Sequence, residues 1–385
     1  MQKTLLSICL SLMIFANIGC DNVQRVLHNA KTVPTVKIGF VVAGERISYP
    51  NGAEMAVTEI NEKGGLLGMP VELIGHINNE AILDVSVQLA ESLILEEGVV
   101  ALIGPNRSSH AAVVGPIAQK HRIPMVTTTA TNPNVTQAGD FVFMASFTDS
   151  FQGAVMAQFA KNELGISNAA LITRSGDLYT EGISEFFESN FTSLGGNVVA
   201  HVFFDSGTLD YTQQLTQIAD LLPDALFTAG FVQDIADITQ QARVVPLLNG
   251  DGAPTIFLGA DSWDSTLLFD DENAEIEGSF FSGHFSPETD EPNARAFVET
   301  YEAIYEFTPT GGVAVSYDAV KLLIEAIERA ESLDPEMIRD ELAATKNYVG
   351  ATSISSYNEN RHPTKSAVIF TIKNGEKHFY KQIHP

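Results

Sequence analysis

From Thr35 onward, short apolar runs alternate with segments that have one apolar face. Val36–Val42, Val71–Ile77 and Val99–Ile103 are short, mainly apolar runs, which predict strands, and Val99–Ile103 is apolar throughout. Between them, apolar residues recur at the spacing of a helix face, and the first such segment stops at Gly64-Gly65. Strands that alternate with helices over short loops predict an α/β fold with parallel sheets covered on both faces.

The chain shows this alternation twice. The first series continues with a helix at Ser109–His121 and a strand at Pro124–Thr128. The second series has predicted helices at Ser150–Leu164, Thr180–Leu194, Tyr211–Leu221 and Asp234–Arg243, and predicted strands at Ala169–Thr173, Val198–Phe204, Asp224–Thr228 and Thr255–Gly259. The tail has predicted helices near Ala294–Tyr305, Val313–Ala330 and Pro335–Thr345 and strands near Ala367–Ile372, which are too few for a third domain.

We therefore expect two Rossmann-like lobes with parallel central sheets, joined by three crossings of the chain. The crossings are predicted near Ser146–Ser150, Glu277–Phe281 and Val349–Ser353. The N-terminal lobe then comprises residues 35–147 plus 281–350, and the C-terminal lobe comprises residues 148–280 plus 351–385. The length of 385 residues and the hydrophobic content of 45% suit two cores better than one.

Acidic residues dominate the charge. The chain has 48 Asp and Glu against 22 Lys and Arg, a formal net charge of -26. A chain of this charge repels phosphate backbones and anionic lipid headgroups, so nucleic acid is not an expected partner. The acidity itself is interpreted as a solubility feature of the surface.

The N-terminus resembles an export signal. Lys3 precedes an apolar stretch from Leu5 to Ala16, which is shorter than the roughly 20 residues that span a bilayer. We expect a signal peptide at residues 1–19, lipidation of Cys20 and a polar tether at residues 20–34, so that the only membrane contact is the lipid anchor. The alternative is an ordinary secretory peptide with a coincidental cysteine, because Asn17 departs from the lipobox pattern.

No pattern of an enzyme is visible in the sequence. There is no dinucleotide fingerprint after the first strand, and no Walker A, HExxH or GxSxG motif. The 9 histidines lack the spacing of metal ligands, and no cysteine remains after Cys20 for thiol chemistry. The sequence therefore predicts no catalysis, no cofactor and no metal.

Two loops carry polar groups at the carboxyl ends of predicted strands, where ligands bind in parallel sheets. The first, Gly104–His110, leads into a helix whose free N–H groups and Ser108 hydroxyl suit a carboxylate. The second, Thr127–Pro133, is rich in hydroxyl groups. The alternatives are that Ser108 is only a helix N-cap and that the threonines serve strand propensity.

In order along the chain, several motifs resemble those of the leucine/isoleucine/valine-binding proteins, the type I periplasmic receptors of ABC transporters. They are Gly64-Gly65-Leu66-Leu67-Gly68, Gly104 to Ser109, Thr129-Ala130-Thr131-Asn132-Pro133, Ser175 to Gly182, Asp210-Tyr211-Thr212, Phe227 to Phe231 and Gly259-Ala260-Asp261. The resemblance runs from about Pro34 to the C-terminus and implies a two-lobed clamp that closes on a small molecule.

The resemblance also implies roles for individual residues. Ser108, Thr129 and Thr131 match the grip on the main chain of an amino acid, with the Thr129 carbonyl and Thr131 hydroxyl as acceptors for the ammonium. Tyr179 matches an aromatic side chain of the second lobe, and Phe231 stands where a tyrosine is common. Asp261 matches an acidic residue that pairs with the ammonium, unless it only caps a turn beside Ser262.

The chain departs from the leucine binders beside the expected pocket. Asn106 and Arg107 stand where those proteins have an apolar residue and a disulfide cysteine, and Arg46 lies in a loop expected close by. We therefore expect a more polar or acidic ligand side chain, unless Arg107 points to solvent. The partners expected are a small molecule, such as an amino acid, and an ABC permease. A sensor is the alternative function, an enzyme comes third, and the sequence does not name the ligand.

Overall fold

The computed structural model describes residues 34–44, 48–268 and 276–385. The predicted signal peptide, Cys20, the tether up to residue 33 and Arg46 lie outside the described residues. Among the described helices, none combines the length and the apolar character needed to cross a membrane.

The first lobe is built on a five-stranded sheet in the order β2-β1-β3-β4-β5, with all neighbouring strands parallel. Its strands are β1 (Val36–Ala43), β2 (Val71–Asn78), β3 (Ala101–Ile103), β4 (Met125–Thr127) and β5 (Val142–Met144). The helices that connect them are α3 (Tyr49–Glu62), α4 (Leu83–Ser92) and α5 (Ser108–His121), with short turns η1 (Leu93–Glu97) and η2 (Pro133–Ala138). The central strands are mainly apolar and, apart from Lys37 in β1, buried, as expected of a sheet covered on both faces.

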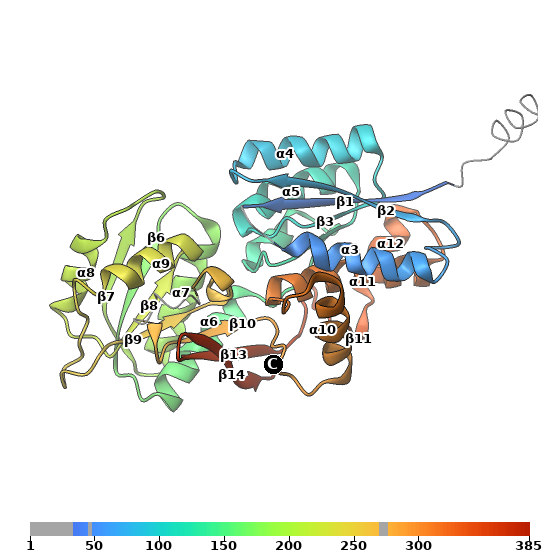
Figure 1. Cartoon of the computed structure of the whole chain (residues 1–385). Coiled ribbons are helices and arrows are strands. Elements are labelled where there is room, and N and C mark those ends of the chain that lie inside the picture. The colour runs from blue at the N-terminus through green and yellow to red at the C-terminus, as the bar shows by residue number, and fades with distance from the viewer. Residues whose placement is uncertain (1–33, 45–47, 269–275) are drawn as a thin grey trace, which may run out of the picture. The chain divides into compact units, whose positions relative to one another are not determined.

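Separate clusters of buried side chains cover the two faces of this sheet. One cluster joins the sheet to α3 and to helices from late in the chain, α10 (Pro292–Tyr305), α11 (Gly311–Ala330) and α12 (Pro335–Ala343). The other cluster joins it to α4, η1 and α5. Figure 1 shows α4 across the strands from α3 and α11. Helices α10, α11 and α12 of the tail therefore pack onto the first lobe.

The second lobe has a seven-stranded sheet in the order β14-β13-β10-β9-β8-β6-β7. Its strands are β6 (Asn168–Arg174), β7 (Asn197–Phe204), β8 (Ala225–Ala229), β9 (Ile256–Gly259), β10 (Phe280–Gly283), β13 (Ala367–Lys373) and β14 (Glu376–Ile383). Its helices are α6 (Asp149–Gln158), α7 (Leu178–Ser193), α8 (Thr212–Ala219) and α9 (Val232–Gln241), with a π-helical turn η3 (Phe159–Glu163) and 3-10 turns η4 (Asp261–Trp263) and η5 (Thr266–Leu268). Strands β6 to β10 are parallel, whereas β13 and β14 pair antiparallel at the edge. These two sheets and their helices confirm the predicted α/β class with two lobes.

Two crossings between the lobes lie further along the chain than the sequence suggested. Phe280–Gly283 is still strand β10 of the second sheet, and the first-lobe core begins with Phe285. The hairpin of β11 (Lys346–Val349) and β12 (Ser353–Ser356) packs into the first-lobe core through Tyr348 and Ile354, so the chain returns to the second sheet only before β13. Each strand of this hairpin has four residues and buries only one of them, so its local sequence pattern is too short to predict a strand.

Candidate ligand-binding site

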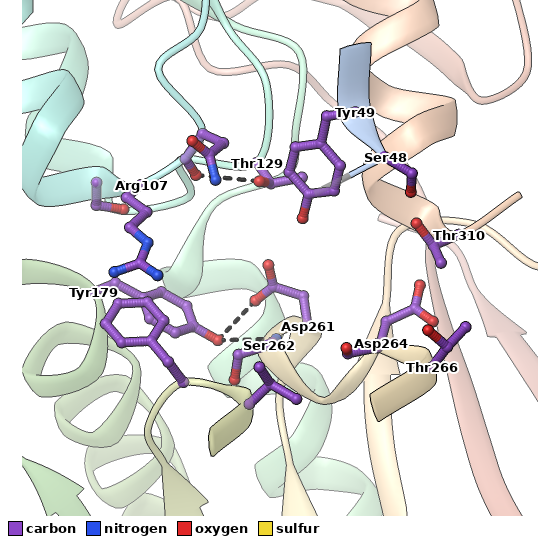
Figure 2. Close-up of a pocket in the computed structure, with 15 residues that line it drawn as sticks. Ser48, Tyr49, Arg107, Thr129, Tyr179, Asp261, Ser262, Asp264, Thr266 and Thr310 are labelled. Atoms are coloured by element: carbon purple, nitrogen blue, oxygen red, sulfur yellow. Dashed lines mark hydrogen bonds between the residues drawn. The ribbon is translucent and has the colours of Figure 1, made fainter. Parts of the chain in front are cut away.

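A cavity of about 180 Å³ collects most of the predicted binding residues (Figure 2). It is smaller than the roughly 300–1,000 Å³ of pockets for drug-sized ligands, so it suits a small metabolite. Its lining is Ser48, Tyr49, Asn106, Arg107, Ser108, Thr129, Tyr179, Phe231, Val232, Asp261, Ser262, Asp264, Ser265, Thr266 and Thr310. Residues that follow β3, β4, β6, β8 and β9 meet here, at the carboxyl ends of parallel strands in both lobes.

The loop between β3 and α5 forms one wall. Gly104 turns the chain with a φ of +85°, and a Cβ at this position would lie 2.1 Å from the Val41 carbonyl oxygen, so only glycine fits. The Asn106 side chain pairs with both main-chain groups of Ala43, accepting at 2.7 Å and donating at 3.1 Å. The Asn106 amide therefore fixes the loop to the end of β1, and its oxygen and nitrogen both already have a hydrogen-bond partner.

Helix α5 begins at Ser108, one residue earlier than predicted, and its N-cap is Arg107. Ser108 is therefore not the N-cap that the alternative interpretation required. Its hydroxyl oxygen accepts a hydrogen bond from the Asn132 N–H at 3.1 Å, and the hydroxyl proton stays available for another acceptor. The first N–H groups of a helix have no intrahelical acceptor, so this helix end favours an anion.

Thr129 and Thr131 differ in their relation to the cavity. Thr129 lines it, and its hydroxyl donates to the Asn106 carbonyl oxygen at 3.1 Å. Thr131 is fully buried and does not belong to the lining. Its carbonyl oxygen accepts from the Asp149 N–H at 2.8 Å, so its main chain holds the start of α6. The predicted hydroxyl of Thr131 is thus not on the cavity wall in this structure.

Aromatic rings of the second lobe form the opposite wall. The rings of Tyr179 and Phe231 stack with centroids 6.1 Å apart. The Arg107 guanidinium carbon lies 4.2 Å from the centroid of Phe231, so Arg107 extends over the cavity instead of pointing to solvent. Burial lowers the pKa of Arg107 from its usual value, without removing its charge at neutral pH.

Asp261 lies immediately after β9, at the edge that faces the cavity, where the sequence placed it. Its carboxylate does not cap its own turn. One oxygen accepts from Tyr179 Oη and Gln152 Nε2, both at 2.9 Å, and the other lies 3.1 Å from His284 Nε2. Tyr179 and Gln152 are neutral donors, which orient the carboxylate without cancelling its charge.

Asp264 also lines the cavity, but it has a cationic partner. One of its oxygens lies 2.5 Å from Lys377 Nζ, and the other accepts from the Gly311 N–H at 2.8 Å. In the part of the chain that the structure describes, Asp261 has no Lys or Arg partner and Arg107 has no carboxylate partner. Among the described residues, the cavity thus contains a carboxylate whose one ion-pair candidate is His284, and a guanidinium that has no carboxylate partner.

The sequence missed part of the lining. Tyr49, at the start of α3, points its hydroxyl into the cavity, and burial raises its pKa to about 12 (Figure 2). Ser48, Asp264, Thr266 and Thr310 form a polar end of the cavity that was not predicted. These residues come from different segments of the chain, and Ser48 and Tyr49 follow Arg46, whose loop was expected close to the pocket.

The two lobes touch beside the cavity. Ser109 Oγ, on α5, donates to Asp177 Oδ2 at 2.7 Å and accepts from the Leu178 N–H at 3.1 Å. Asn132 Nδ2 donates to the Leu178 carbonyl oxygen at 2.8 Å. These bonds connect the first lobe to the start of α7.

A larger cavity of about 620 Å³ lies along the segments that join the sheets. Lys365, the one Lys or Arg among its described lining residues, already donates to the Ala145 carbonyl oxygen and to Thr352 Oγ1, both at 2.8 Å. This cavity therefore offers no free cation, and it contains none of the predicted binding residues.

The fold is that of a type I periplasmic binding protein. It has two α/β lobes linked by three segments and a small polar cavity at the carboxyl ends of the parallel strands. The chain belongs to the periplasmic binding protein family, whose sequence profile matches residues 42–377. Proteins of this family carry ligands without transforming them, which agrees with the predicted absence of catalysis. Membership also implies an exported protein.

Three solved structures illustrate the similarity. A leucine-binding protein, LivK, of Thermotoga maritima is 35% identical over 91% of this chain and 99% of its own, with a TM-score of 0.83. The branched-chain amino acid transporter substrate-binding protein LivJ of Streptococcus pneumoniae, in complex with isoleucine, is 26% identical over 91% and 100%, with a TM-score of 0.82. A solute-binding protein of an ABC transporter from Rhodopseudomonas palustris, in complex with 3,4-dihydroxybenzoic acid, shares the fold at 22% identity over 91% and 97%, with a TM-score of 0.78.

Proposed function

We propose that this protein is the extracytoplasmic receptor of an ABC transporter and that it binds an α-amino acid in the cavity at Asp261. The observation that carries the proposal is the Asp261 carboxylate, which lines the cavity, is oriented by Tyr179, Gln152 and His284, and has no Lys or Arg partner among the described residues. Such a carboxylate favours a ligand ammonium group, because burying an unpaired charge is costly.

The start of α5 supplies the complementary contact. Ser108 and the free N–H groups of this helix end suit the carboxylate of the same ligand. Thr129 lies on the same wall and offers a hydroxyl and a carbonyl oxygen. The amino acid is then held at its carboxylate by the first lobe and at its ammonium by the second.

This division explains how binding drives closure. Contacts that bridge the lobes exist only when the lobes are together, so the ligand shifts the population of conformers toward the closed one. A closed receptor presents a different surface from an open one, and we infer that a permease recognises this difference. The relatives described as transporter proteins favour delivery to a permease over the alternative role of a sensor.

A melting-temperature screen tests the ligand class. The purified protein is heated with each common amino acid and with analogues in which a hydroxyl replaces the α-amino group. At least one amino acid should raise the melting temperature, because a ligand that binds only the folded state stabilises it by about 2.7 kcal/mol at a hundredfold excess over Kd. Equal stabilisation by an analogue without the amine, or no response to any amino acid, contradicts the proposal.

We also propose that Cys20 carries a lipid anchor, on the basis of the apolar stretch that ends at Gly19-Cys20. Mass spectrometry of the protein from membranes of expressing cells should find Cys20 as the modified first residue. Cys20→Ser should move the protein from the membrane fraction to the soluble fraction. A free N-terminus at any other residue of the wild-type protein counts against the anchor.

A further inference from the structure

Arg107 is not needed for the main-chain contacts assigned above. The α5 N-terminus and Ser108 serve one carboxylate, and Asp261 serves the ammonium, yet a guanidinium also enters the cavity. Figure 2 shows Arg107 reaching down from the first lobe toward the Tyr179 ring, on the side of the cavity away from Asp264 and Thr310. The positive charge of Arg107 therefore lies on a different part of the cavity wall from Asp264 and Thr310.

The acidic residues nearest to Arg107 are engaged elsewhere. Asp234 accepts from Arg174 at 3.0 Å and from the Phe231 N–H at 2.9 Å. Asp177 caps α7 and accepts from Ser109 at 2.7 Å. Within the described residues, no ion pair or hydrogen bond of the Arg107 guanidinium is found, and its defined contact is the face of Phe231.

The contact with Phe231 holds the guanidinium over the face of the ring, and among the described residues its N–H groups have no acceptor. The N–H edge of a guanidinium matches the two oxygens of a carboxylate, which arginine binds in a bidentate manner. An apolar ligand side chain placed here would desolvate the charge without compensating it, at a cost that disfavours leucine-like ligands.

Resting on the proposed function, we infer that Arg107 recognises an anionic group on the ligand side chain, and that the receptor prefers an acidic amino acid to a neutral one. The cavity then has two places for anions, at the α5 N-terminus and at Arg107, and one for a cation, at Asp261. An amino acid with two carboxylates and one ammonium satisfies all three, whereas leucine satisfies only two.

Calorimetry with four ligands tests this inference. Glutamate and aspartate are titrated into the wild-type protein beside their amides, glutamine and asparagine, which match them in shape. The wild type should bind one of the acids about tenfold or more tightly than its amide. Equal or tighter binding of the amides, or tight binding of leucine with no response to the acids, overturns the inference and leaves the proposed amino-acid function standing.

Substitution of Arg107 separates the side-chain role from a grip on the α-carboxylate. Arg107→Met keeps the length of the side chain and removes its charge, and Arg107→Gln serves as a second variant if the first does not fold. Either should weaken the acid about tenfold or more and leave the amide within about threefold, which removes the discrimination. The exposed Arg295→Met on α10 is the matched control and should behave as wild type.

The pattern of losses decides between the explanations. An equal loss for acid and amide assigns Arg107 to the α-carboxylate, and it overturns the side-chain inference. Failure of every amino acid to bind the folded wild-type protein refutes the proposed function itself, and the inference with it.

Discussion

Asp149 is fully buried behind the cavity wall and is connected to Asp261 through the side chain of Gln152. Gln152 Nε2 donates to Asp149 at 2.8 Å and to Asp261 at 2.9 Å, so a single amide connects the two carboxyl groups. Burial raises the pKa of Asp149 well above its ordinary 3.8, and the nearby charge of Asp261 adds to the shift. Burial therefore favours the protonated form of Asp149 more than in an exposed carboxyl group, while its neighbour Asp261 lines the cavity.

The raised pKa has a consequence for stability. A carboxyl group whose pKa is higher in the folded state contributes stability below its unfolded pKa, and this contribution is lost as the pH rises through the folded value. Asp149→Asn keeps an oxygen for Gln152 and cannot ionise. We expect its free energy of unfolding to fall less than that of the wild type as the pH rises from about 4.

Denaturant unfolding at a series of pH values measures this effect. Asp251→Asn, at an exposed turn far along the chain from α6, is the control and should keep the wild-type dependence. A variant at Asp149 whose stability follows pH as steeply as the wild type would show that this carboxyl group ionises normally in the folded protein.

At the residue scale, sequence reasoning located the side chains that directly follow strands. Ser108, Thr129 and Asp261 were found because a short loop leaves little freedom in where they end up. Thr131 is only two residues beyond Thr129, but the chain has already turned inward toward Asp149. Tyr49 and Thr310 reach the cavity through tertiary packing of α3 and α11, which no local pattern encodes.

The segments that join the lobes are held together by a buried ionic cluster. Asp318 on α11 accepts hydrogen bonds from Tyr348 at 2.8 Å and from the main chain of Ala351 and Thr352 at 2.9 and 2.7 Å. Lys365, just before β13, donates to Thr352 in the turn of the β11–β12 hairpin and to the carbonyl oxygen of Ala145, just after β5. Three segments that lie far apart in the sequence therefore meet at this lysine. Burial lowers the pKa of Lys365 to about 8, and the ammonium still carries its charge at neutral pH.

Removal of the cation should deprive Asp318 of a nearby positive charge, and it leaves the Ala145 carbonyl oxygen and Thr352 without their donor. We expect Lys365→Met to lower the free energy of unfolding by about 1–3 kcal/mol, the usual cost of a buried polar group left without its hydrogen-bond partner. Lys381→Met is a matched control, because Lys381 pairs with Glu163 at the surface, where such a pair contributes about 0–1 kcal/mol. Denaturant unfolding of both variants makes the comparison, and equally small losses would contradict a structural role for the cluster.

Most elements of both lobes could be predicted from the sequence, because buried parallel strands such as β1, β6 and β8 are mainly apolar. The exceptions have weaker local signals. Strand β14 lies at the edge of its sheet and is polar over most of its length, and the hairpin β11–β12 is short. The crossings were misplaced for the same reason, since their positions depend on which core these small strands join.

At the scale of the whole molecule, the cavity combines one half-site from each lobe. The first lobe brings α5 and Arg107, and the second brings Asp261 and the aromatic wall. The bonds of Ser109 and Asn132 to the start of α7 support the two lobes when they are together. In the proposed function the ligand adds the remaining bridge, which would link the free energy of binding to that of closure.

Titration calorimetry of Asp261→Asn with an α-amino acid that binds the wild type tests the central claim most directly. The substitution preserves the shape of the side chain and removes the charge that faces the ammonium, and Asp251→Asn controls for the loss of an acid elsewhere. A charge-assisted hydrogen bond contributes about 1.5–3 kcal/mol, so the account predicts a loss of affinity of roughly tenfold or more for Asp261→Asn alone. Unchanged affinity in the folded variant would contradict it.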